Sequence, residues 1–163
     1  MFNKDSFCSF CGTKQTVENY PKTCPNCQTI TYINPLPVAV VLLPVDNELL
    51  VIRRNIPPVG RLALPGGFIE SGETWQKACQ RELFEETGIE ITAEEVQLFD
   101  VRSAPDGTVL IFGIAENKKK EEIIFTQNDE TQELTFIDSP LELGFPLHTE
   151  VVRTWFEQSK IRK

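Results

Sequence analysis

Runs of apolar and β-branched residues predict several strands along the chain. Two of them, at 38–43 and 48–54, are separated by the turn-like residues 44–47 and predict a strand pair. Further strands are expected at 62–64, 96–102, 108–115 and 134–137. Residues 117–122 are almost all charged, which predicts a solvated loop.

Two segments have the apolar spacing of amphipathic helices. The first covers 74–87, and Gly88 follows it where a left-handed residue would end the helix. Its buried stripe is expected to contain Ala78, Cys79 and Leu83. The second covers about 148–158, and its buried side is expected to contain Val151, Val152, Trp155 and Phe156. His148, the only histidine, lies near the start of this helix and is expected on the surface.

Residues 1–33 differ in composition from the rest of the chain. They hold four of the five cysteines and have little apolar material from which to build a core. Residues 34–37, Asn-Pro-Leu-Pro, predict an extended connector because each proline restrains the residue before it. We therefore expect a small domain at 1–33 and a larger one at 34–163.

Composition limits the partners and the location of the protein. The chain has 163 residues and a formal net charge of −8. Because phosphate contacts supply most of the affinity of duplex-binding proteins, this acidity argues against nucleic acid as the main partner. No apolar run reaches the roughly eighteen residues of a membrane span, and residues 1–7 lack an apolar signal core. A cytoplasmic protein is expected.

Four cysteines form two Cys-x-x-Cys pairs that are separated by twelve residues. They are Cys8, Cys11, Cys24 and Cys27. In a cytoplasmic chain this spacing favours a tetrahedral Zn²⁺ site over disulfides or unliganded thiols. Four thiolates leave no open position, which indicates a structural ion. The pattern resembles a zinc ribbon, although Gln28 stands where a second glycine is frequent.

Segment 67–89 carries the strongest chemical pattern in the chain. Glu82, Glu85 and Glu86 are three and four residues apart, so a helix places them on one face. Like charges this close repel one another in water, but they suit a hard cation such as Mg²⁺, which prefers oxygen ligands. An isolated Glu-x-x-Glu-Glu would more often be an ordinary solvated helix face. The rest of the segment decides between the two interpretations.

The whole segment resembles the Nudix box. Every specified position of that pattern is filled, by Gly67, Glu73, Arg81, Glu82, Leu83, Glu85, Glu86, Gly88 and Ile89. The resemblance implies an α/β/α sandwich with a mixed β-sheet. It also implies hydrolysis of a diphosphate linked to another moiety, with Mg²⁺ or Mn²⁺ as the cofactor. The metal ligands would be Glu82, Glu85 and Glu86, with the Gly67 carbonyl assisting.

Arg81 is expected to organise the acidic residues of the box. It is spaced to pair with Glu73 through the N-terminal region of the helix. It also stands beside Glu82 and four residues before Glu85, so it can offset their repulsion and orient a carboxylate.

The general base stays open among Glu85, Glu86 and Glu133. Some members of the family use an acid outside the box, and Glu133 resembles that downstream acid in position. For Glu130 an ordinary loop carboxylate is the favoured interpretation.

Five further residues have both a functional and a structural interpretation. Arg53 or Arg54 could reach a substrate phosphate, but a solvent or structural role is favoured for both. Phe68, Phe112 and Phe136 could stack on a nucleobase or flavin, but core packing is favoured for each.

The ribbon and the box together resemble compact zinc-ribbon Nudix proteins that include FAD and ADP-ribose pyrophosphatases. NADH pyrophosphatases of this kind carry a Ser-Gln-Pro-Trp-Pro-Phe-Pro-type motif after the box, but residues 90–116 contain no tryptophan and only Pro105. The expected substrate is thus FAD, ADP-ribose or an NADH-like compound, with release of a nucleoside monophosphate. The alternative is a non-catalytic nucleotide-sensing or partner-binding protein that uses the ribbon. The family commonly dimerises, so a homodimer is also compatible with the resemblance.

Overall fold

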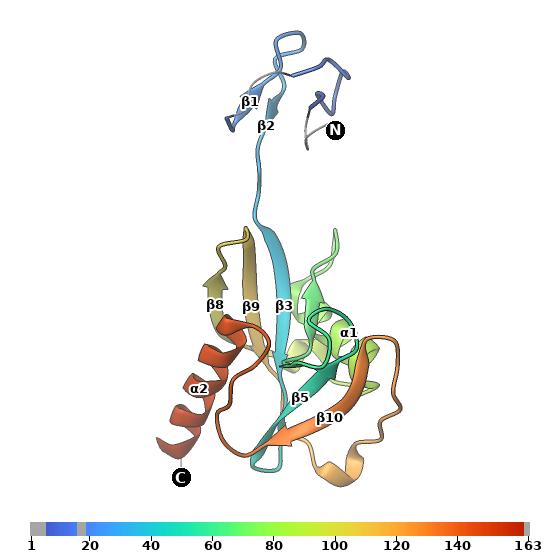
Figure 1. The fold of residues 1–163 in the computed structure, drawn as a ribbon, viewed down its shortest axis with the longest axis vertical. Coiled ribbons are helices and arrows are strands. Elements are labelled where there is room, and N and C mark those ends of the chain that lie inside the picture. Colours follow the sequence, from blue (N-terminus) through green and yellow to red (C-terminus); the bar gives the residue numbers. More distant parts are fainter. Residues whose placement is uncertain (1–5, 16–18, 162–163) are drawn as a thin grey trace. The chain divides into compact units, whose positions relative to one another are not determined.

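Residues 6–15 and 19–161 are described in the computed structural model, in which the chain forms two compact units, Met1–Pro35 and Leu36–Lys163 (Figure 1). The first five residues, which contribute to the expected absence of a signal core, lie outside the described residues. Within the described residues, no helix is both long and apolar enough to cross a membrane.

The smaller unit has little regular secondary structure. Strand β1 (Lys22–Thr23) pairs antiparallel with β2 (Ile30–Thr31). Among its described residues, Cys8 and Cys24 are the most deeply buried apolar ones. The unit is therefore organised around its cysteines rather than around a conventional hydrophobic core.

The first sheet of the larger unit has the strand order β7-β3-β9-β8. Strand β3 (Leu36–Leu42) pairs in parallel with β9 (Thr108–Ile114) and antiparallel with β7 (Gly66–Phe68). Strand β8 (Gln97–Ser103) forms one edge and pairs antiparallel with β9. One parallel pair among antiparallel pairs makes this sheet mixed, as predicted.

The second sheet is built around β5 (Glu48–Arg54). Its neighbours are β10 (Thr131–Ile137), β4 (Pro44–Val45) and β6 (Leu62–Ala63), all antiparallel to it. Strand β10 begins before the predicted 134–137 and contains a bulge. Thr131 lies opposite Arg54 and Glu133 lies opposite Arg53, so Gln132 is an extra residue in the ladder.

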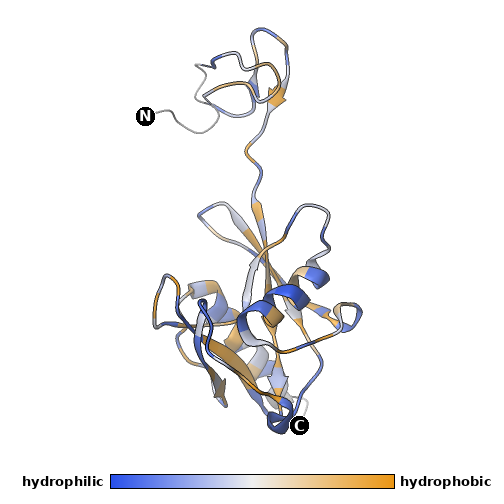
Figure 2. Cartoon of the chain, turned by 90° about the vertical axis from the view of Figure 1, so that its right-hand side faces the viewer, coloured by the Kyte–Doolittle hydropathy of each residue, from blue (hydrophilic) through white to orange (hydrophobic). Residues whose placement is uncertain are grey.

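The two helices lie on opposite sides of the strands (Figure 1). Helix α1 (Trp75–Thr87) buries the predicted stripe of Ala78, Cys79 and Leu83 against one cluster of apolar strand residues. Helix α2 (Pro146–Ile161) packs against a second cluster, to which it contributes Val151, Val152, Trp155 and Phe156. Hydrophobic residues are concentrated along the strands between these layers (Figure 2). The predicted α/β sandwich is confirmed.

Strand alternation divides the side chains of β3 between the two clusters. Val40 and Leu42 belong to the α2 cluster, whereas Ala39 and Val41 belong to the α1 cluster, as does Leu43 directly after the strand. A nearly continuous apolar run is what a strand covered on both faces requires.

The ends of α1 agree with the sequence. The Thr74 side chain accepts a hydrogen bond from the Lys77 N–H, as an N-cap does. Gly88 has φ 73°, and its N–H donates to the Phe84 carbonyl over 2.7 Å. That left-handed conformation strongly favours glycine and ends the helix where predicted.

Two expectations from the sequence are corrected. His148 is buried, with 6% exposure, and does not lie on the surface. Its ring packs against those of Phe112 and Phe145, with centroid distances of 5.7 and 5.0 Å. The charged segment 117–122 is largely exposed, as expected, but it is not entirely loop, because Lys120–Glu122 form a short 3₁₀ turn. Another 3₁₀ turn lies at Ala93–Glu95.

Candidate active site

The loop before α1 approaches the helix most closely at Gly67. A Cβ atom placed on Gly67 would lie 2.5 Å from both carboxylate oxygens of Glu82. Such a contact is far inside the van der Waals limit, so a side chain at residue 67 would displace the Glu82 carboxylate from its present position. The Gly67 backbone and the Glu82 carboxylate are therefore immediate neighbours, as two ligands of one ion must be.

Glu86 lies under the same loop and is almost completely buried. Its carboxylate accepts a hydrogen bond of 2.8 Å from the Gly66 N–H. Burial raises the pKa of the Glu86 carboxyl to about 8, and the negative charges of Glu82 and Glu130 add to the increase. A buried carboxylate of this kind is stabilised in its ionised form by a nearby cation.

Arg81 connects the loop to the acidic face of α1. Its guanidinium donates to both carboxylate oxygens of Glu73, each over 3.0 Å, which confirms the expected pair. It also donates to Glu82 over 2.6 Å and to Glu85 over 3.0 Å. A fourth acceptor is the Phe68 carbonyl, at 3.0 Å. One side chain thus holds three carboxylates and the loop backbone.

The carboxyl groups of the box differ in their proton affinity. Hydrogen bonding to Arg81 lowers the pKa of Glu73 below its ordinary value. Burial raises the pKa of Glu82, although Arg81 opposes the increase. Glu73 is therefore the firmly ionised partner of Arg81, whereas Glu82 and Glu86 are the carboxyls that would gain most from added positive charge.

The residues of the box fit a hard divalent cation by their chemistry. Glu82, Glu85 and Glu86 offer carboxylate oxygens, and Gly67, whose backbone lies close to the Glu82 carboxylate, has a carbonyl oxygen to add. Arg81 supplies the positive charge at Glu82 and Glu85 in this structure. That these residues hold the ion stays a prediction.

The two downstream acids are placed differently. Glu133 lies opposite Arg53, whose Nε donates to the Glu133 carboxylate over 2.6 Å. Its neighbour Leu134 packs on the α1 cluster, so strand alternation puts Glu133 on the other face of the sheet. The charge of Glu130, in contrast, raises the pKa of both Glu82 and Glu86. This placement argues against Glu133 as the base and brings Glu130 toward the box.

The structure distinguishes the two interpretations for most of the arginines and phenylalanines singled out in the sequence. Arg53 has the expected structural role, since it also donates to the Gly60 carbonyl over 2.9 Å. Arg54 lies over the Phe145 ring at 5.2 Å, and its buried Nε has no hydrogen-bond partner within the described residues. Phe112 is fully buried and Phe136 packs on the α1 cluster, as expected. Phe68 is 57% exposed, which corrects the expected core position.

Two polar contacts near the box were not anticipated from the sequence. Nδ1 of His148 accepts a hydrogen bond of 3.3 Å from the Leu64 N–H, two residues before Gly66. The Asn128 side chain bonds the last turn of α1. Each contact joins residues that are distant along the chain, so no local pattern marks it.

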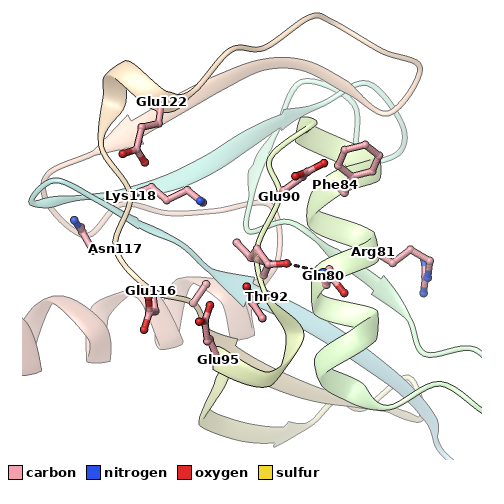
Figure 3. A pocket seen from close by; sticks show the side chains of 12 residues that line it. Gln80, Arg81, Phe84, Glu90, Thr92, Glu95, Glu116, Asn117, Lys118 and Glu122 are labelled. Atoms are coloured by element: carbon pink, nitrogen blue, oxygen red, sulfur yellow. Dashed lines mark hydrogen bonds between the residues drawn. The ribbon is translucent and has the colours of Figure 1, made fainter.

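A hollow of about 860 Å³ in the larger unit lies beside α1 (Figure 3). Its lining includes Glu90, Glu95, Glu116, Glu122 and Lys118. Gln80 and Arg81 of α1 also belong to the lining. A lining with so many carboxylates repels an anionic nucleotide, so the chemistry is assigned to the box rather than to this hollow.

The four paired cysteines of the smaller unit converge. All four sulfur atoms lie within 4.8 Å of one another, and two pairs are 3.6 Å apart. They are not joined in disulfides. Four thiolates at about 2.3 Å from a tetrahedral Zn²⁺ would have sulfurs about 3.8 Å apart, so the cluster fits this ion.

The two cysteine turns are built alike. The Gly12 N–H donates to the Cys8 carbonyl over 2.9 Å, and the Gln28 N–H donates to the Cys24 carbonyl over 3.0 Å. Gln28 has φ 60°, close to the 72° of Gly12. The second turn therefore keeps its shape without the glycine. Hydrogen bonding to Thr13 lowers the pKa of Cys11 to about 6, which favours the thiolate that a metal requires.

Comparison with known proteins agrees with this site. A family model described as NUDIX domain matches residues 34–156. An ADP-ribose pyrophosphatase of Methanocaldococcus jannaschii is 42% identical over 76 residues, which cover 46% of this chain and 44% of that protein. The NAD-capped RNA hydrolase NudC of Haemophilus influenzae is 39% identical over 90 residues, covering 52% of this chain and 34% of that protein. The chain thus matches less than half the length of either relative.

Solved structures show the same fold. A NUDIX hydrolase from Nitrosomonas europaea has a TM-score of 0.72 at 24% identity and covers 94% of this chain and 91% of that chain. A MutT/nudix family protein from Enterococcus faecalis has a TM-score of 0.66 at 21% identity and covers 80% of this chain and 64% of that chain. Because the family model covers well over half of the sequence, and the box and fold agree with it, the chain belongs to the NUDIX domain family.

Proposed function

We propose that the protein hydrolyses the pyrophosphate bond of a nucleoside diphosphate linked to another moiety and releases a nucleoside monophosphate. The observation that carries this proposal is the close approach of Gly67 to the Glu82 carboxylate, next to the buried Glu86. Oxygen donors gathered around a glycine loop suit a divalent cation and a phosphate chain.

Each residue of the box has a role in this proposal. Glu82, Glu85 and Glu86 hold Mg²⁺ or Mn²⁺ together with the Gly67 carbonyl. When bound, the cation offsets the charge of the phosphoryl group and makes water a stronger acid. Arg81 keeps the carboxylates oriented through its bonds to Glu73 and to the Phe68 carbonyl.

The base is proposed among Glu85, Glu86 and Glu130. Glu130 replaces Glu133 because the carboxylate of Glu133 is bonded to Arg53. Measuring the turnover of Glu85→Gln, Glu86→Gln, Glu130→Gln and Glu133→Gln at saturating metal would separate these candidates. A Glu133→Gln variant that lost as much turnover as Glu86→Gln would restore Glu133 as a candidate.

The smaller unit is proposed to hold one structural Zn²⁺ through its four cysteines. Support comes from the convergence of the four sulfurs and from the absence of disulfides among them. The unit then contributes to stability rather than to the reaction itself.

The substrate class is tested with a panel of FAD, ADP-ribose, NADH, an NAD-capped RNA 5′ end and nucleoside triphosphates. The relatives named for ADP-ribose and NAD-capped RNA justify these choices. With Mg²⁺ present, we expect AMP from an adenosine diphosphate derivative, and no product after chelation of the metal. Binding of a panel member without turnover of any would favour a nucleotide sensor and overturn the hydrolase proposal.

A further inference from the structure

The side chain of Asn128 joins the end of α1 to the start of β10. Its Nδ2 donates to the carbonyls of Glu85 and Glu86, each over 3.1 Å. Its Oδ1 accepts from the N–H groups of Glu130 and Thr131, over 2.9 and 2.8 Å. Both amide hydrogens and both lone pairs of the oxygen are therefore used, which is the full capacity of an asparagine.

These bonds satisfy groups that neither element can satisfy alone. The last carbonyls of a helix have no partner within the helix, and those of Glu85 and Glu86 belong to the last turn of α1. On the other side, the Asn128 N–H donates to the Thr131 carbonyl over 3.1 Å, so the same residue also closes the turn that leads into β10. One side chain thus caps the helix and shapes the loop.

A second asparagine, directly after β5, fixes the same loop. The Asn55 N–H donates to the Glu130 carbonyl over 2.7 Å, and Asn55 Nδ2 donates to the Asn128 carbonyl over 3.2 Å. The backbone of Glu130 is therefore held at its N–H by Asn128 and at its carbonyl by Asn55. Such a backbone cannot shift relative to α1 without breaking several hydrogen bonds.

We propose that Asn128 is a positioning residue that sets the distance between Glu130 and the carboxylates of Glu85 and Glu86. The inference rests on the proposed hydrolase function, in which these acids share the reaction. In this role Asn128 does not touch the substrate. It acts by fixing the loop that carries Glu130 against the helix that carries the metal ligands.

The first test measures the bridge itself and is independent of activity. Hydrogen exchange would be followed at the N–H groups of Glu130 and Thr131 in the full-length protein. We expect faster exchange at both in Asn128→Ala, with no change at the core strands β3 and β9. Asn128→Asp keeps an acceptor oxygen but loses the Nδ2 donors, so it should keep these two amides protected. Asn117→Ala, at an exposed loop asparagine, is the matched control and should leave them unchanged. Unchanged exchange in Asn128→Ala would overturn the inference.

The second test asks whether Asn128 acts through Glu130. We expect Asn128→Ala to lower kcat about 10- to 100-fold with little change in KM, which is typical of supporting residues around a metal site. In a Glu130→Gln background the same change should lower kcat less than about threefold, because the partner it positions is already lost. An equal loss in both backgrounds would show that Asn128 does not act through Glu130 and would overturn the inference.

The proposed hydrolase function and the proposed role of Asn128 can fail independently of each other. If Glu130→Gln turned over like the unmodified protein, the proposed role of Glu130, and with it the catalytic role of Asn128, would be lost. If no variant and no substrate gave turnover, the hydrolase proposal would fail, while the exchange measurement would still decide whether Asn128 holds the loop.

Discussion

The guanidinium of Arg81 holds the carboxylate of Glu73 through two hydrogen bonds of 3.0 Å. Glu73 precedes α1, and Arg81 lies in its middle, so the pair fastens the loop to the helix it leads into. The planar guanidinium also reaches Glu82, Glu85 and the Phe68 carbonyl. An ammonium group cannot reproduce this geometry, because it is a point charge on a flexible chain.

Replacing Arg81 by lysine should therefore weaken metal binding. We expect Arg81→Lys to raise the Kd for Mn²⁺ about 10- to 100-fold and to lower kcat/KM by a similar factor. The Kd is measured by electron paramagnetic resonance titration. Arg102→Lys, at an ion pair with Asp100 on β8, is the control and should bind metal normally. Metal affinity that was unchanged in Arg81→Lys would contradict the role of Arg81.

Glu86→Gln should lose turnover while the fold survives. A glutamine keeps an acceptor for the Gly66 N–H but removes the carboxylate charge. The change should therefore lower turnover without destabilising the loop. We expect kcat to fall at least about 100-fold, which corresponds to roughly 3 kcal/mol of barrier. Thermal unfolding monitored by circular dichroism checks the fold, and Glu94→Gln at an exposed acid serves as the control. Nearly normal turnover in Glu86→Gln would remove Glu86 from the site.

Purified protein should contain one zinc ion per chain, and Cys24→Ser should abolish it. Because the smaller unit is organised around its four cysteines, we expect faster proteolysis and hydrogen exchange in its described residues after this change. Turnover by the larger unit should be reduced by less than about threefold, since the cysteines do not belong to the box. Elemental analysis gives the metal content, and Cys79→Ser, which alters a buried thiol of α1 outside the cysteine cluster, should keep its zinc.

The stability of the protein should depend on pH through His148. Burial lowers the pKa of His148 from its ordinary 6.5 to about 3, and the charge of Arg54 adds to the effect. Between these values the unfolded chain binds a proton that the folded chain does not. The contribution of His148 to the free energy of unfolding is therefore complete above pH 6.5 and is lost as the pH falls toward 3. The slope of this contribution is at most about 1.4 kcal/mol per pH unit.

Urea unfolding at several pH values between about 4.5 and 7 checks this dependence. The difference between the unmodified protein and His148→Gln isolates the histidine, because the carboxyl groups are common to both. The free energy of unfolding of the unmodified protein should fall more steeply on acidification. Parallel curves for the two proteins would show that His148 titrates alike in the folded and unfolded states.

Local patterns predicted most of the fold and the box itself. Apolar runs gave the main strands, and the spacing of Ala78, Cys79 and Leu83 gave the buried side of α1. These features depend on neighbours in sequence, which alternation and helical periodicity describe well. The box was predictable for the same reason, since all its residues lie within one loop and one helix.

What could not be predicted depends on contacts between distant segments. His148 looked like a surface residue because it is polar and stands near a helix start, but its partner is the N–H of Leu64. Asn128 bonds the end of α1, which lies more than forty residues earlier in the chain. Phe68 was expected in the core, yet it stands at the end of an edge strand and is exposed.

The bulge at Gln132 bears on how this chain is aligned with related ones. Gln132 has no partner in the ladder of β10. The usual alternation of faces is therefore interrupted there, and counting residues from the core of β10 back to Glu130 does not tell on which face the Glu130 side chain lies. A gap-free alignment to a relative that lacks the bulge would set a residue of the opposite face against Glu130. Equivalent residues of this strand are identified by the residue across the ladder, which is Arg54 for Thr131 and Arg53 for Glu133, and not by counting along the chain.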